Sequence, residues 1–174
     1  PAATKNPWRI LTNGRTIARM IRDQGVDLVH ARSRAPAWSA YIAARRTGAH
    51  FVTTYHGIYN ERGRLKHAYN SVMARGEVII ANSDYTAEIV RERYALDTSR
   101  ITVINRGVDI ARFDRTNIEV NRIAALRSAW NIAPQRRIVL HPARLTRWKG
   151  QTTAVEAAAI LMRQPGGNDL DFVF

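Results

Sequence analysis

The segment Arg136-Arg-Ile-Val-Leu-His-Pro-Ala-Arg-Leu-Thr-Arg-Trp-Lys-Gly150 decides the fold. Its first six residues are an apolar run that predicts a buried strand, and a short loop with three cations follows: Arg144, Arg147 and Lys149. After Gly150, apolar residues recur at helical spacing: Val155, Ala158, Ala159 and Met162. A strand, a basic loop and a helix N-terminus together place cations and free N–H groups where a phosphate can bind.

The sequence before this segment alternates between helical and extended patterns. Helices are predicted at 8–24, 36–46, 61–75, 83–94 and 119–130, and strands at 26–30, 51–55, 77–81, 100–104 and 169–174. Helices that alternate with short apolar strands are typical of a parallel sheet. We therefore expect an α/β protein with a doubly wound, Rossmann-like lobe.

The pattern changes near residue 110, where mixed charge replaces the strand–helix alternation, and it resumes at Arg136. We expect a first lobe at 1–110 whose start is truncated, a linker at 111–135, and the beginning of a second, incomplete lobe at 136–174. Because 39 residues are few for a domain, we expect the 174 residues alone to be inactive.

The charge of the chain is strongly positive, with 27 Lys and Arg against 14 Asp and Glu and a formal net charge of +13. Such a field attracts polyanions, including anionic lipid surfaces and phosphorylated substrates. A general compositional bias toward Arg is the alternative explanation. The chain has no Cys, which excludes disulfides, thiol catalysis and Cys-ligated metals.

Ligands of parallel α/β sheets bind outside the carboxyl ends of the strands. That rule turns the order of elements into a set of candidate site residues: His30 to Arg34, His56 and Gly57, Asn82 and Ser83, Asn105 to Asp109, and Arg144 to Gly150. The residues after the five strands are of the same few types: His, Gly, small polar residues and cations.

Five short motifs in this order resemble family-4 retaining glycosyltransferases of the GT-B fold: Asp27-Leu-Val-His30, Thr54-Tyr-His-Gly57, Ala81-Asn-Ser83, Val103-Ile-Asn-Arg-Gly-Val-Asp109 and Ala143-Arg-Leu-Thr-Arg-Trp-Lys-Gly150. Each is weak alone, but five motifs in the family's order and spacing are strong together, and the resemblance covers nearly the whole chain. The Gly-rich first loop of the family and its later Glu-x7-Glu motif are not in this sequence, and Arg106 replaces a common Asn.

The resemblance implies transfer of a sugar from a nucleoside-diphosphate donor with retention of configuration. It implies that Arg144 and Lys149 bind the donor diphosphate and that His56 is the catalytic histidine. A solvated basic loop and a hydrogen-bonded core histidine are the respective structural alternatives.

His30, Arg32 and Ser83 are candidates for an acceptor cleft. Arg32 and Arg34 suit an acidic acceptor, or they form a solvated edge. Gly107 and Asp109 are expected at the hinge, where Gly107 would supply a positive φ. No His pair has ligand spacing on one helix, so neither a metal nor a resident cofactor is expected.

The expected partners are the nucleotide-sugar donor, a glycan or glycolipid acceptor and an anionic membrane surface, with no nucleic acid. The cationic stretch at 61–75 is the candidate lipid-facing surface. The expected location is the cytoplasm, at the inner face of the membrane. Two alternatives remain: a basic non-catalytic module that binds nucleic acid or lipid, and an epimerase or phosphorylase on the same two-lobe fold.

Overall fold

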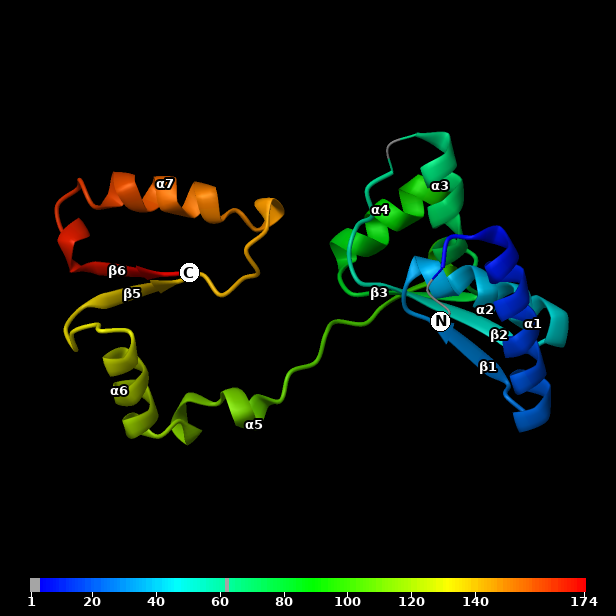
Figure 1. The fold of residues 1–174 in the computed structure, drawn as a ribbon, viewed down its shortest axis with the longest axis horizontal. Coiled ribbons are helices and arrows are strands. Elements are labelled where there is room, and N and C mark those ends of the chain that lie inside the picture. Colours follow the sequence, from blue (N-terminus) through cyan, green and yellow to red (C-terminus); the bar gives the residue numbers. More distant parts are fainter. Residues whose placement is uncertain (1–3, 62) are drawn as a thin grey trace. The chain divides into compact units, whose positions relative to one another are not determined.

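A computed structural model describes residues 4–61 and 63–174 and divides the chain into two compact units, one up to Gly107 and one from Val108 onward (Figure 1). The division falls three residues before the expected end of the first lobe. Residues 111–135, expected as a linker, group with the second unit. Each unit is described separately below.

The first unit contains a four-stranded, all-parallel sheet in the order β1-β2-β3-β4. Its elements are α1 (Pro7–Gln24), β1 (Leu28–Ala31), α2 (Arg34–Thr47), β2 (His50–Tyr55), α3 (Arg64–Asn70), β3 (Val78–Ala81), α4 (Asp84–Tyr94) and β4 (Ile101–Val103), with 3₁₀ turns at Ser71–Ala74 and Thr98–Arg100. The strands follow chain order without reversal, as in one half of a doubly wound sheet. The predicted parallel α/β fold is confirmed.

The register of the sheet brings the carboxyl ends of its strands to one edge. His30 pairs with Val52, Tyr55 with Ala81, and Ala81 with Val103. Each of the first three strands is followed by a helix that returns the chain to the opposite edge, because parallel strands require such a crossover. Residues that directly follow the strands are therefore neighbours in space.

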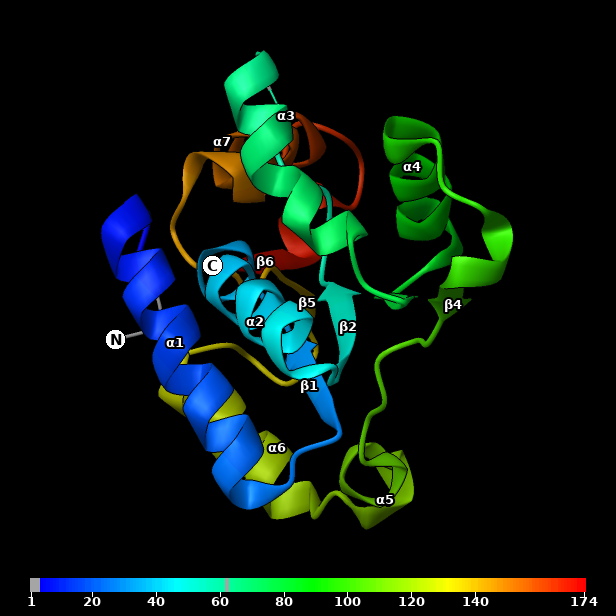
Figure 2. The same ribbon diagram turned by 90° about the vertical axis from the view of Figure 1, so that its right-hand side faces the viewer.

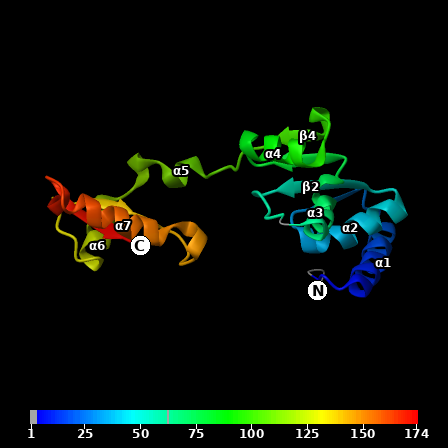
Figure 3. The ribbon, with the colours of Figure 1, turned by 90° about the horizontal axis from the view of Figure 1, so that it is seen from above.

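The two N-terminal helices pack closely and lie side by side in Figures 1 and 3. A Cβ added at Gly14 of α1 would lie 3.1 Å from the Ile42 side chain of α2. Ser39 of α2 donates from Oγ to the Ile10 carbonyl at 3.1 Å. Figure 2 shows α2 in front of the strands β1 and β2, and this packing fixes the loop that joins β1 to α2.

The core of the first unit lies between the sheet and its helices. Tyr55, Met73 and Ile79 are almost completely buried there. Burial of large apolar side chains contributes about 1.5–3 kcal/mol each to the free energy of folding. Thr53, also fully buried, donates from Oγ1 to the Met73 carbonyl at 2.6 Å.

The helix expected at 61–75 is shorter in the structure. The α-helix α3 begins at Arg64 and ends at Asn70, where a 3₁₀ turn continues to Ala74. Arg62 lies outside the described residues. Only part of the predicted basic stretch is therefore α-helix. Arg75, which was expected on this cationic surface, lies after the 3₁₀ turn, and its guanidinium carbon is 5.1 Å from the Trp38 ring centroid.

The second unit contains a βαβ unit with a parallel pair of strands. Its elements are α5 (Ile110–Phe113), α6 (Val120–Ala129), β5 (Arg137–Leu140), α7 (Gln151–Leu161) and β6 (Leu170–Val173), with 3₁₀ turns at Arg115–Asn117, Arg147–Lys149 and Gly167–Asp169. Arg136 donates from Nε to Asp171 at 2.6 Å, which ties the start of β5 to β6. Arg127 of α6 donates to the carbonyl of Arg136 at 2.6 Å. Among the described residues, no helix has the length and apolar character needed to cross a membrane.

Candidate functional site

The carboxyl edge of the first sheet holds a cavity of about 580 Å³. Its walls come from β1, β2, β3 and the segments that follow the four strands: His30, Arg32, Thr54, His56, Ile80, Asn82, Ile104, Asn105, Arg106 and Gly107. The structure thus brings together seven of the candidate residues at the predicted strand ends: His30, Arg32, His56, Asn82, Asn105, Arg106 and Gly107.

His56 lies in this cavity as a neutral imidazole. Arg32 donates from Nε to Nε2 of His56 at 3.3 Å. Partial burial lowers the pKa of His56, and the positive charges of Arg32 and Arg106 and the nearby His30 lower it further. With Nε2 accepting, the ring proton is on Nδ1, which is then the atom that can donate to a ligand.

The backbone around His56 is held in position. Asn82, at the end of β3, donates from Nδ2 to the His56 carbonyl at 3.3 Å. Gly57 has φ of 154°, a region that side-chain-bearing residues rarely adopt. The chain therefore turns away directly after His56, and the ring stays at the strand end.

His30 and Thr54 make a contact between the two neighbouring strands. Nε2 of His30 lies 2.7 Å from Oγ1 of Thr54, whose side chain is nearly buried. This hydrogen bond fixes the His30 ring at the cavity wall, so His30 presents a fixed surface to a ligand.

Two other predicted residues act as helix caps. Oγ of Ser83 accepts from the Thr86 amide at 3.2 Å at the start of α4, and Ser83 is not among the residues that line the cavity. Oδ1 of Asp109 accepts from the Arg112 amide at 3.1 Å at the start of α5. The positive φ expected at Gly107 is wrong: this residue is not among the described glycines with positive φ. It does lie at the division between the units.

The basic loop of the second unit carries Arg144 and Lys149 around the Trp148 ring. The Arg144 guanidinium carbon lies 5.7 Å and the Lys149 ammonium 4.6 Å from the ring centroid. In the described part of the chain neither cation forms an ion pair with an acid. Gly150, with φ of 76°, then begins α7 without a side-chain cap, so N–H groups and cations lie near each other.

Two features of this loop were not foreseen. Residues Arg147–Lys149 form a 3₁₀ turn, and Trp148 contacts both cations. An aromatic residue between cations was the available sequence signal, because such rings attract guanidinium and ammonium groups.

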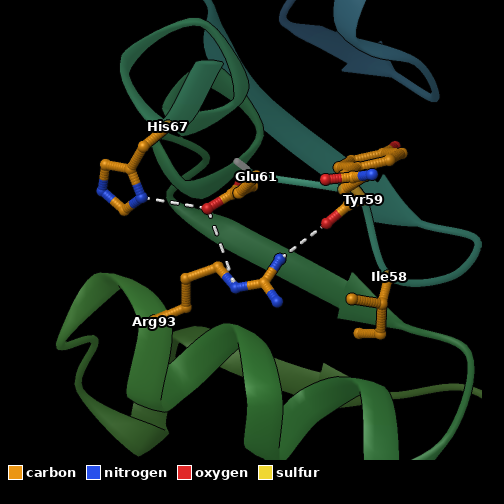
Figure 4. A pocket seen from close by; sticks show the side chains of 6 residues that line it. Ile58, Tyr59, Glu61, His67 and Arg93 are labelled. Carbon is orange, nitrogen blue, oxygen red and sulfur yellow. Dashed lines mark hydrogen bonds and ion pairs between the residues drawn. The ribbon is translucent and has the colours of Figure 1, made fainter. Parts of the chain in front are cut away.

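Glu61, in the segment that follows His56, is another feature that the sequence reasoning missed. Figure 4 shows its carboxylate among His67, Arg93 and Tyr59, at a cavity of about 730 Å³. Oε2 of Glu61 lies 2.9 Å from Nδ1 of His67 and 3.7 Å from Nε of Arg93. The Tyr94 hydroxyl donates to the other carboxylate oxygen.

Glu61 is ionised in the folded protein. Burial of its side chain by itself raises the pKa, but hydrogen bonds from Tyr94, Asn70 and His67 and the charge of Arg93 outweigh burial, so the pKa is lowered. The carboxylate therefore fastens the loop after β2 to α3 and α4. Within the described residues, no group of three His, Cys, Asp or Glu side chains is placed to hold a metal ion.

Comparison with solved structures shows that this chain is similar to part of several glycosyltransferases. A glycosyltransferase from Rickettsia africae matches 95% of this chain with a TM-score of 0.79 and 39% identity, over 44% of its own length. Anabaena HepE in complex with UDP-glucose matches 91% of this chain with a TM-score of 0.73 and 20% identity, over 42% of its own length. The HepE similarity shows the fold alone.

Comparison with curated sequences gives a D-inositol 3-phosphate glycosyltransferase from Jonesia denitrificans, 26% identical over 154 residues. The match covers 79% of this chain and 35% of the relative. The chain thus spans about a third of this relative and less than half of the solved neighbours. The family model described as Glycosyltransferase Family 4 matches residues 1–112, which is more than half of the 174 residues. The chain therefore belongs to glycosyltransferase family 4.

Proposed function

We propose that the protein transfers a sugar from a nucleoside-diphosphate donor to a glycan or glycolipid acceptor, with retention of configuration. The observation that carries this proposal is the cluster at the carboxyl edge of the first sheet. There, a neutral His56 is oriented by Arg32 and held by Asn82 at a cavity of about 580 Å³. Membership in family 4 supports the same reaction class.

The donor diphosphate is proposed to bind at the loop of Arg144 and Lys149. When the glycosidic bond of a nucleotide sugar breaks, negative charge develops on the β-phosphate. The Arg144 guanidinium can donate two parallel hydrogen bonds to phosphate oxygens, and Lys149 adds a point charge. Neither side chain pairs with an acid in the described residues, so both are available to the ligand.

His56 is proposed to act on the donor sugar or the acceptor through Nδ1. Because Nε2 accepts from Arg32, Nδ1 can donate to a sugar hydroxyl. The lowered pKa keeps the ring neutral at pH 7.

The acceptor is proposed to be presented at the cytoplasmic face of a membrane. The support is the cationic surface of α3, where Arg64 and Lys66 are exposed. Each cation near an anionic leaflet contributes about 1 kcal/mol to the free energy of membrane binding. Several such charges hold a protein beside a lipid-linked acceptor without a membrane span.

The test is a transfer assay on the full-length protein with a panel of nucleotide sugars. Glycan and glycolipid acceptors are supplied, and the anomeric configuration of the product is read by NMR. We expect a product with the configuration of the donor, and strongly reduced transfer by His56→Ala. An inverted product removes the retention assignment. Interconversion of the nucleotide sugar without transfer to any acceptor favours an epimerase instead.

A further inference from the structure

A second cavity lies at the carboxyl end of β1, beside the His56 cavity. It has a volume of about 630 Å³, within the range of small-molecule sites. The loop from β1 to α2 borders both cavities, because Arg32 lines the first and Ser33, Arg34 and Ala35 line the second. The two cavities therefore share one bordering loop.

The walls of this second cavity carry positive charge and no acid. Lys5, Arg34 and Lys66 line it together with two aromatic residues, Tyr59 and Tyr69. In the part of the chain that the structure describes, none of the three cations forms an ion pair. Three converging cations without a carboxylate repel one another, so a bound anion relieves that repulsion.

Arg34 is held in a fixed orientation. Its Nη1 donates to Oδ1 of Asn70 at 2.8 Å, and Asn70 is completely buried. Its guanidinium carbon lies 4.2 Å from the centroid of the Tyr59 ring. The hydrogen bond uses one of the five N–H donors, and among residues 4–61 and 63–174 the rest of the planar fork has no acid partner, so it can donate to an oxyanion.

The helix α2 adds backbone donors to the same wall. It is 14 residues long and begins at Arg34, and its N-cap residue Ser33 forms no side-chain cap. The first N–H groups of a helix lack intrahelical partners and carry the positive end of its dipole. These backbone N–H groups lie on the same wall as the fixed Arg34 guanidinium. The guanidinium alone already favours an anion in this cavity, and the N–H groups add further donors.

We propose that this cavity binds the phosphate group of a phosphorylated acceptor, whose reacting hydroxyl then lies in the adjacent His56 cavity. The inference rests on the proposed function for the identity of the ligand as acceptor. A phosphate monoester carries about −1.5 to −2 charges and three acceptor oxygens. The fork of Arg34, the ammonium of Lys66 and the N-terminus of α2 match that charge and that number of acceptors.

The test is an NMR titration of the ¹⁵N-labelled chain at constant ionic strength, first with inorganic phosphate and then with glycerol 1-phosphate. We expect saturable shifts of the amides of Ser33, Arg34 and Ala35. The amide signals of residues 33–35 are observed separately from those of residues 144–150, so binding at the basic loop of the second unit is distinguished from binding at this cavity. Lys66→Gln, an exposed substitution, should weaken binding on the order of tenfold through loss of a charge-assisted hydrogen bond. Arg34→Lys should weaken it similarly, because an ammonium cannot replace the fork.

The matched control is Arg45→Gln. Arg45 is exposed in the last turn of the same helix and does not line the cavity. The Arg45→Gln substitution should leave the affinity for phosphate unchanged. An equal loss of affinity in Arg45→Gln and Lys66→Gln would show attraction by net charge alone and overturn the proposal.

A second arm separates a soluble phosphate from a lipid headgroup. Vesicles of phosphatidylcholine with phosphatidic acid replace glycerol 1-phosphate, and vesicles of phosphatidylcholine alone are the control. Shifts at residues 33–35 with either phosphate source support the site and identify the source. If none of the phosphate sources produces a saturable shift at residues 33–35, the proposed phosphate site is refuted. The measurement involves no sugar transfer, so the anion site survives a failed transfer assay, whereas the proposed function does not.

Discussion

Replacing Glu61 by Gln tests whether its carboxylate holds the loop that follows His56. The side chain is 7% exposed and accepts from His67 and Tyr94, with Arg93 close by. Gln keeps the size of the side chain and one carbonyl oxygen but removes the charge. The substitution therefore isolates the electrostatic part of the interaction.

The expected loss in the free energy of unfolding follows from the hydrogen-bond donors that lose a charged acceptor. A hydrogen bond to a charged group contributes about 1.5–3 kcal/mol, and one acceptor oxygen remains in Gln. We therefore expect the free energy of unfolding of the first unit to fall by about 2 kcal/mol. For a unit of this size the corresponding change in Tm is roughly 8–15 °C.

The pH dependence has a definite sign. The pKa of Glu61 is lowered from its ordinary value of 4.5, so its ionised form is favoured by folding. The stabilisation is complete above pH 4.5 and is lost as the pH falls through the folded pKa. The difference between wild type and Glu61→Gln should therefore be largest at neutral pH and shrink below 4.5.

The assay is hydrogen exchange resolved by segment, with thermal unfolding beside it. Amides of α3 and α4 should exchange roughly 30-fold faster in Glu61→Gln at pH 7, which corresponds to 2 kcal/mol. Glu88→Gln is the control, because Glu88 is 62% exposed and its ion pair is with Arg91 of the same helix. Its effect should stay within about 0.5 kcal/mol. Equal effects of the two substitutions, or an unchanged Tm in Glu61→Gln, would refute the reasoning.

Three further predictions concern the two units. Arg144→Ala and Lys149→Ala in the full-length protein should each lower turnover on the order of 100-fold, since each removes a fixed positive group from the developing charge; near-normal turnover in both, with folding intact, would contradict the donor assignment. Arg32→Gln should raise the pKa of His56, because a positive charge that lowers it is removed; an NMR titration of the ring that shows no upward shift would contradict this. Gly76→Ala should destabilise the first unit by about 1–3 kcal/mol, because the new Cβ would lie 2.7 Å from the Val78 carbonyl oxygen; urea unfolding measures it, and an unchanged midpoint would count against it.

The parallel sheet was predictable because each of its elements has a local signature. The apolar runs at 51–55 and 77–81 match β2 and β3 within one residue. The helix predicted at 36–46 ends in the structure at Thr47, where Gly48 forms a left-handed cap with φ of 80°. The convergence of His30, Arg32 and His56 followed from one rule, that ligands bind at the carboxyl ends of parallel strands.

What could not be predicted depends on contacts between residues far apart in the sequence. The α-helix within the stretch expected at 61–75 ends at Asn70, whose buried side chain accepts from Arg34, 36 residues earlier. Glu61 receives its hydrogen bond from Tyr94, 33 residues later. A lone acid before the basic residues Arg64 and Lys66 was the available signal for a charge cluster, but it did not reveal which partners lie close.

The placement of acids determines which cations can bind a ligand. Among the described residues of the first unit, acids form ion pairs away from the His56 cavity: Glu61 with α3 and α4, Glu77 with the start of β2, and Glu88 within α4. Arg32 and Arg106 are left at the carboxyl edge without an acid in ion-pair distance. A net charge of +13 alone gives only a diffuse attraction. Because the acids lie elsewhere, the positive field is concentrated at the strand ends, and there it also lowers the pKa of His56. The same arrangement of charge therefore attracts an anionic ligand and keeps the histidine beside it neutral.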